Sequence, residues 1–220
     1  MGLIAKAKGG GNFELIPEDQ HLARCVMVAD IGTHEHVYEG EVKHKHQCVI
    51  GWELPEVLQV YDPDKGEEPA MLSSFYSVSL NEKAKLRHML ESWRGRAFTP
   101  EELEGFDLFC LCGIGCLVQV VHAHKVKKNN EVWAKVQNVS KVHKSMIVPA
   151  QVNRSLTFSM DTATSDDFEA LPEWLKKHVR KSAEWPVFCK RTGAVDSQVG
   201  EAAEYQEDLS GGAAQPDVPF

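Results

Sequence analysis

Lysine and arginine residues lie near aromatic residues at several places along the 220-residue chain. Proteins that bind single-stranded nucleic acid use both kinds of side chain, because cations follow the phosphates and ring faces stack on the bases. The pattern therefore predicts a surface that binds an unpaired strand. The candidate stacking rings are Tyr38, Trp52, Phe75, Tyr76 and Trp133. The candidate phosphate contacts are Lys43, Lys45, Arg94, Lys125, Lys127, Lys128 and Lys135.

Because side chains alternate between the two faces of a strand, the sequence predicts different surroundings for two of the tryptophans. Trp52 falls on the same face as Ile50, so the pattern fits a place in the core as well as a place against a base. Trp133 shares its face with Lys135, which favours the binding surface. Residues 125–128 fall at a predicted hairpin tip, where the lysines form either a finger over the bound strand or an ordinary solvated turn.

The C-terminal tip has a second kind of chemistry. The chain ends in Asp217, Val218, Pro219 and Phe220, and the last residue offers a ring beside a free carboxylate. A partner protein can take the ring into an apolar pocket and bind the carboxylate with arginine or lysine. The tip is therefore predicted to bind partner proteins. The alternative is a solubilising tail that ends in Phe by chance.

Three pairs of histidines have i, i+2 spacing, which places both rings of a pair on one face of a strand. The pairs are His34/His36, His44/His46 and His122/His124. The first two flank one predicted hairpin, and four imidazoles meeting across it would form a zinc site. An exposed imidazole can also stack on and hydrogen-bond to nucleic acid. We expect this second role and no bound metal.

The sequence contains no motif typical of an enzyme. It lacks a phosphate-binding loop, a nucleophile elbow and the HExxH pattern. We therefore expect a non-enzymatic protein without a cofactor. Cys110, Cys112 and Cys116 lack the paired CxxC spacing of a zinc ribbon and are expected to be free thiols.

Composition and charge restrict the class of protein. A hydrophobic share of 43% is enough for a buried core, and no apolar run is long enough to cross a bilayer. Residues 1–12 lack the apolar stretch of a secretory signal, so we expect a cytoplasmic protein without a membrane partner. The net charge is −8, but residues 193–220 carry six acids and no Lys or Arg. The rest of the chain is near neutral, so its basic clusters can act locally.

The order of predicted elements indicates a fold class. Strands are expected over residues 21–31, 41–54, 71–80, 115–124 and 132–142. A helix is expected over 82–93 with Asn81 as its N-cap, a short helix starts after Thr99, and 56–70 is expected to be a loop or hairpin tip. This is the order of an OB-fold, a mainly β, five-stranded Greek-key barrel with a helix between strands 3 and 4. Other small β-barrels would give a similar pattern.

Three regions are expected along the chain. Residues 1–150 should form the OB-fold domain, and residues 151–192 a helical extension with a helix over 166–184. Residues 193–220, rich in Gly, Ala, Gln and acids, should form a disordered tail. The sequence leaves open whether the helix around Trp174 packs on the barrel, mediates self-association or adds its basic residues to a DNA path.

Several segments resemble those of bacteriophage single-stranded DNA-binding proteins with an OB-fold. The resemblance spans about residues 1–144. The segments that carry it are Tyr38-Glu39-Gly40, Val49-Ile50-Gly51-Trp52-Glu53-Leu54-Pro55, Tyr76-Ser77-Val78-Ser79-Leu80, Lys85-Leu86 and Trp93-Arg94-Gly95-Arg96-Ala97-Phe98. The tip is similar to that of bacterial single-stranded DNA-binding proteins, which ends in aspartates followed by Ile-Pro-Phe. Here Val218 stands in place of Ile, and Gln215-Pro216 replaces part of the acidic run.

The resemblance implies a protein that coats and protects single-stranded DNA during phage replication, recombination and repair. It implies that the tip recruits replication and recombination proteins and competes with DNA for the basic groove. Self-association into a homo-oligomer is left open. Two alternatives remain at this point: a recombination mediator or strand-annealing protein, and a zinc-binding protein built on the histidine ribbon.

Overall fold

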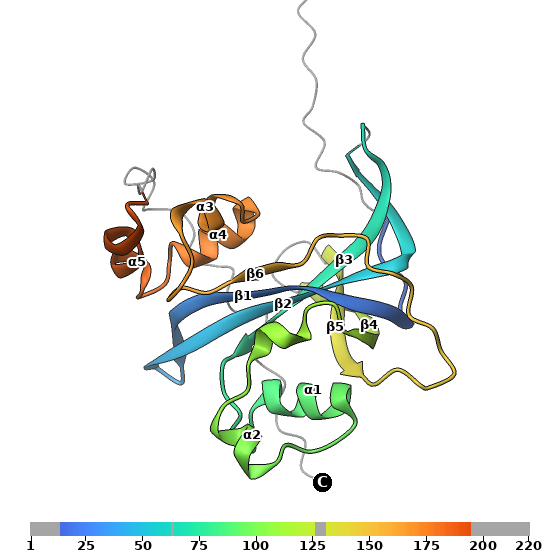
Figure 1. Ribbon diagram of the computed structural model, residues 1–220, viewed down its shortest axis with the longest axis horizontal. Helices are drawn as coiled ribbons and strands as arrows, with labels where there is room; N and C mark the ends of the chain where they lie inside the picture. The colour runs from blue at the N-terminus through green and yellow to red at the C-terminus, as the bar shows by residue number, and fades with distance from the viewer. Residues whose placement is uncertain (1–13, 63, 126–130, 195–220) are drawn as a thin grey trace, which may run out of the picture.

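The computed structural model describes residues 14–62, 64–125 and 131–194 (Figure 1). Lys127, Lys128 and the tip residues Asp217 to Phe220 lie outside this part, as do the side chains of Tyr38 and Lys125. The described part is mainly β, which confirms the coarse fold class. None of its helices has the length and apolar character needed to cross a membrane.

A six-stranded sheet forms the centre of the molecule. Its five main strands are β1 (Gln20–Tyr38), β2 (Glu41–Asp62), β3 (Gly66–Ser77), β4 (Gly115–Lys125) and β5 (Glu131–Ser140). They pair antiparallel in the order β3-β2-β1-β4-β5, and the short β6 (Leu156–Phe158) runs parallel to β1. Within the described residues no ladder joins β3 to β5, so the sheet is not closed into a barrel.

The hairpin between β2 and β3 is longer than the sequence predicts. The segment 56–70, expected to be a loop, continues both strands, with Leu58 opposite Pro69. A register shift lies between Leu54 and Leu58, and such irregularities accommodate a proline like Pro55 within a strand. The turn signals in this segment therefore mark only the hairpin tip, where Gly66 has a positive φ of 80°.

Two helices and a 3-10 turn connect β3 to β4: α1 (Lys85–Arg94), α2 (Pro100–Glu104) and η1 (Leu108–Leu111). The first helix begins later than predicted, with Ala84 rather than Asn81 at its N-cap. The predicted start of α2 is confirmed, because Thr99 and Glu102 form a reciprocal capping box. In Figure 1, α1 and α2 lie on one side of the sheet. The side chains Leu86, Met89, Leu90 and Trp93 of α1 are buried there in the first core.

Three short helices cover the other side of the sheet (Figure 1): α3 (Ser165–Glu169), α4 (Glu173–Val179) and α5 (Trp185–Thr192). The helical region predicted over 166–184 is divided into α3 and α4, because Pro172 caps α4 and breaks the run. The helices bury a second core against Met27, Ala29, Ile31 and Val49. The middle of β1 and β2 is thus buried on both faces, and the helix around Trp174 packs on the sheet.

Polar contacts hold the helical segment to the edge of β1. The backbone N–H and hydroxyl of Thr33 donate hydrogen bonds of 2.7 and 2.6 Å to Glu184, and Ala183 N–H donates to the Thr33 carbonyl at 3.0 Å. Gly32 makes this approach possible. A Cβ on Gly32 would lie 2.5 Å from Cβ of Ser182, and its φ of +79° also disfavours other residues.

Candidate nucleic-acid interface

Two of the predicted stacking rings belong to the first core. Trp52 has no exposed surface, and Tyr76 is 4% exposed. The ring centroid of Trp52 lies 6.2 Å from that of Trp93 on α1. A base cannot reach either ring in this fold, which corrects the prediction that Trp52 and Tyr76 face bound DNA.

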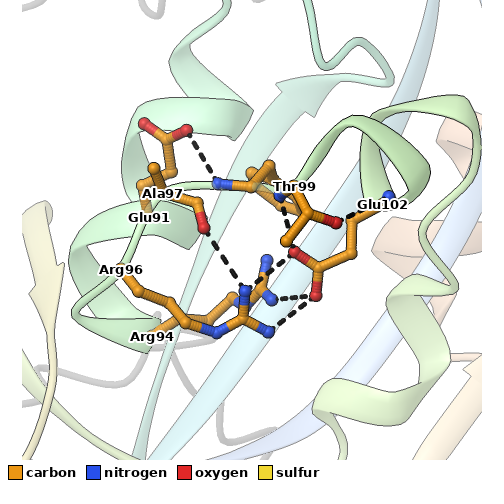
Figure 2. Close-up of polar contacts among 7 residues, drawn as sticks. Glu91, Arg94, Arg96, Ala97, Thr99 and Glu102 are labelled. Carbon is orange, nitrogen blue, oxygen red and sulfur yellow. Dashed lines mark hydrogen bonds and ion pairs between the residues drawn. The ribbon is translucent and has the colours of Figure 1, made fainter.

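The side chain of Arg94 is also bound to other residues of the protein. Its guanidinium is bound to the Glu102 carboxylate and lies 4.4 Å from the centroid of the Phe98 ring. Figure 2 shows Arg96 and the backbone of Thr99 converging on the same carboxylate. The hydrogen bonds from Arg96, Thr99 and Arg94 lower the pKa of Glu102 to about 2. Arg94 therefore stabilises the connection between α1 and α2, which corrects its assignment as a phosphate contact.

Lys43, Lys45 and Phe75 lie on one face of the sheet, which we call the β2–β3 face. Residues 43, 45, 47 and 49 of β2 point to the same side, and Val49 pairs directly with Phe75. Both lysines are exposed, and Phe75 exposes 39% of its surface. Lys43 lies 3.6 Å from the exposed carboxylate of Glu41. The structure thus places three of the predicted residues on one side of the sheet, with Lys45 four and Lys43 six positions along β2 from the residue opposite Phe75.

Trp133 and Lys135 form a second group on β5. They are half-buried and alternate with Ala134 and Val136, which face the first core. Lys85, at the start of α1, lies close to this group. Burial, followed by the positive charge of Lys135, lowers the pKa of Lys85. The β5 group therefore concentrates positive charge beside an aromatic ring.

Helix α4 adds two rings that the sequence prediction missed. The imidazole of His178 lies 4.9 Å from the ring of Phe75, and the indole of Trp174 lies 6.4 Å from it, measured between centroids. Trp174 falls outside the buried series Phe168, Leu171, Leu175 and Val179. That break in the helical period was the available signal, but the sequence does not indicate that α4 reaches Phe75.

The histidine ribbon does not assemble a metal site. His34 pairs with Lys45 and His36 with Lys43 across the β1–β2 ladder, whereas His46 pairs with Thr33. Directly paired residues share a face, so the pair 34/36 and the pair 44/46 lie on opposite faces of the hairpin. The part of the chain that the structure describes contains no cluster of three or more His, Cys, Asp or Glu able to hold a metal ion. The alternative in which four imidazoles meet across the hairpin does not fit this register.

A scan against models of known protein families and a search of curated proteins both find no match to the chain. What the protein binds is therefore inferred from the positions of its own side chains. Among the residues that the structure describes, the β2–β3 face and the β5 group are the predicted clusters that remain accessible.

Proposed function

We propose that the protein binds single-stranded DNA without strong sequence preference and recruits partner proteins through its C-terminal tip. The observation that carries the proposal is the β2–β3 face, where the exposed ring of Phe75 shares one side of the sheet with Lys43 and Lys45. A ring that can stack on a base and cations that can follow the backbone are the two elements of a single-strand site. The β5 group of Trp133 and Lys135 repeats this combination.

We further propose that the sheet is an OB-fold opened between β3 and β5. Three consecutive antiparallel strands followed by a fourth beside the first is Greek-key order. Helix α1 lies between β3 and β4 in sequence and contacts both β3 and β5, at the place where the barrel would close. OB-folds are partly open barrels that bind oligonucleotides on the face of strands 2 and 3 and with the loops 1–2 and 4–5.

Under this assignment, most of the remaining predicted residues fall on the strand 2–3 face or beside the two loops. Phe75, Lys43 and Lys45 lie on the strand 2–3 face. Tyr38 ends β1 beside the first of the two loops. Lys125 ends β4, and Lys127 and Lys128 lie between β4 and β5 in the sequence. The acidic residues 195–220 would compete with DNA for these cations, and Asp217 to Phe220 would bind the partner.

A charge-neutralising variant tests the β2–β3 face. Replacing both Lys43 and Lys45 with Gln should weaken binding to oligo(dT), because two phosphate contacts are lost. Each lost contact should also reduce the slope of log affinity against log salt concentration by about 0.7. The matched control replaces the exposed residues Lys144 and Lys190 with Gln and should bind as the wild type does. Equal affinity and equal slope in both variants would exclude this face as the DNA path.

A further inference from the structure

Helix α4 exposes a tryptophan beside a buried stripe. Leu175 and Val179 have no exposed surface, whereas Trp174 is 39% exposed. Leaving part of a large ring in water forgoes hydrophobic stabilisation, at roughly 25 cal/mol per Å² of apolar surface. Exposed apolar surface of this kind gathers at sites that bind other molecules. The position of Trp174 therefore suggests a ligand that covers it.

Trp174 belongs to a group of three rings at the surface, which we call the aromatic shelf: Phe75, Trp174 and His178. The rings of Trp174 and His178 are 6.3 Å apart at an angle of 76°, and each meets Phe75 edge to face, at 70° and 61°. Edge-to-face packing fixes the rings against one another. Phe75 and Trp174 each remain 39% exposed. The shelf joins the β2–β3 face to α4 and offers rigid apolar surface on which bases can stack.

Two lysines extend the shelf. Lys177 and Lys181 are exposed, at the third and seventh positions after Trp174. The hydrogen bond from Lys181 N–H to the His178 carbonyl continues the helical turn beyond α4. Lys177 and Lys181 therefore lie near the side of the helix that carries Trp174. Within the described residues neither lysine has an ion pair. They are therefore available to phosphates.

The other two cations of α4 and its C-terminal end, Lys176 and Arg180, contact groups within the protein. The ammonium of Lys176 is buried between Glu169 and Glu173, at 2.8 and 3.1 Å. The guanidinium of Arg180 lies 5.2 Å from the ring centroid of Phe168 in the second core. Lys176 and Arg180 therefore stabilise the fold, whereas Lys177 and Lys181 face solvent.

The chain just after α4 lies at the β1–β2 hairpin. Lys181 lines a hollow together with His34, Glu35 and His44 at the base of the β1–β2 hairpin. His34 pairs with Lys45 in the ladder, so Lys45 stands on the same face as the hollow's buried imidazole. Lys181 therefore lies near the strands that carry Lys45, with the exposed carboxylate of Glu35 in the same hollow.

We infer that α4 is part of the DNA site, with bases stacking on the aromatic shelf and Lys177 and Lys181 binding the phosphates of the same strand. The inference rests on the proposed function and extends it to the helical segment. It assigns a binding role to Trp174 in addition to the residues of the sheet. The complementary charge and the flat ring surfaces fit an unpaired DNA strand.

The test measures the affinity of the full-length protein for labelled oligo(dT). Replacing Trp174 with Ala should weaken binding by about 5- to 150-fold, the effect of losing one base stack. Trp174→Phe should retain most of the affinity, because a ring remains. Replacing Lys177 and Lys181 together with Gln should lower the log–log salt slope by about 1.4.

The matched controls are Phe109→Ala, which removes another exposed ring, and the Lys144→Gln/Lys190→Gln protein. Both should bind oligo(dT) as the wild type does. If Trp174→Ala fails to fold, the Lys177→Gln/Lys181→Gln protein decides the matter alone. Wild-type affinity and slope in that protein would overturn the inference while leaving the proposed function intact. Failure of the wild type to bind oligo(dT) would instead overturn the proposed function.

Discussion

Glu53 and Asn153 are 100 residues apart in the sequence and are joined by two hydrogen bonds of 2.8 Å. The Asn153 backbone N–H and side-chain amide donate to one carboxylate oxygen of Glu53, and Val152 N–H donates to the other at 2.8 Å. Glu53 has no exposed surface. This buried carboxylate on β2 therefore ties the chain after β5 to the outer face of the sheet, before β6 and the helices.

Replacing Glu53 with Ala should destabilise the protein strongly. The substitution removes the acceptor of three part-buried donors, and a hydrogen bond to a charged group contributes about 1.5–3 kcal/mol. We expect the free energy of unfolding to fall by at least about 2 kcal/mol in a urea titration. The nearby exposed residue Glu56 provides the control, since Glu56→Ala should change it by no more than about 0.5 kcal/mol. Equal stability of the two variants would contradict the tethering role of Glu53.

Truncation of Trp52 should mainly lower stability, whereas truncation of Trp133 should mainly weaken DNA binding. Trp52→Ala opens a cavity in the first core and should lower the free energy of unfolding by about 3–5 kcal/mol. Trp133→Ala on the outer side of β5 should cost less stability and should weaken binding to single-stranded oligonucleotides. Urea titrations and oligonucleotide titrations of both variants distinguish the two effects. An unchanged dissociation constant for Trp133→Ala would remove the β5 group from the DNA path.

His46 should make the stability depend on pH. A hydrogen bond from its Nε2 to Asp30 at 2.8 Å raises the pKa of His46, and the nearby Glu184 carboxylate acts in the same direction. Because the folded-state pKa is higher than the unfolded value of about 6.5, the contribution of the His46–Asp30 pair is complete below that value and is lost as pH rises through the folded pKa.

The His46→Gln variant isolates this contribution. The stability difference between wild type and variant should be largest at acidic pH and should shrink as pH rises above about 6.5. Urea titrations at several pH values measure it, and Asp30→Asn should flatten the same part of the profile. A difference that grows with pH would contradict the ion pair.

Removal of the acidic residues 195–220 should strengthen DNA binding at low salt. Six acidic side chains leave with this segment, so the proposed competition for the cations of the sheet would end. The truncation should keep Gly193, which caps α5, and Ala194, which packs on the second core. Binding of replication or recombination proteins should be lost at the same time. Unchanged DNA affinity at low salt would exclude the competition.

Local patterns in the sequence were enough to place most elements of the sheet. Alternating apolar residues located the five main strands, although β1 continues to Tyr38 beyond the predicted end at residue 31 and the hairpin between β2 and β3 is longer than predicted. The Thr99–Glu102 capping box located α2 because both partners lie within one helical turn. Contacts of this kind depend on neighbouring residues, so they can be read directly from the sequence.

The candidate site depends on long-range contacts, which the sequence does not contain in readable form. Trp52 and Phe75 both lie on strands, and only the packing of α1 on one face and α4 on the other buries the first and leaves the second accessible. Arg94 looked free because its partner Glu102 belongs to a different helix. The shelf of Phe75, Trp174 and His178 joins segments about a hundred residues apart.

Equilibrium titration of the full-length protein with single-stranded and duplex oligonucleotides of the same length, across a series of salt concentrations, tests the central claim most directly. Exposed rings that stack on bases should make single-stranded DNA quench the intrinsic tryptophan fluorescence. We expect tighter binding of the single strand and a logarithm of affinity that falls linearly with the logarithm of salt concentration. Duplex binding that equals or exceeds single-strand binding, or an affinity that does not change with salt, would contradict the claim.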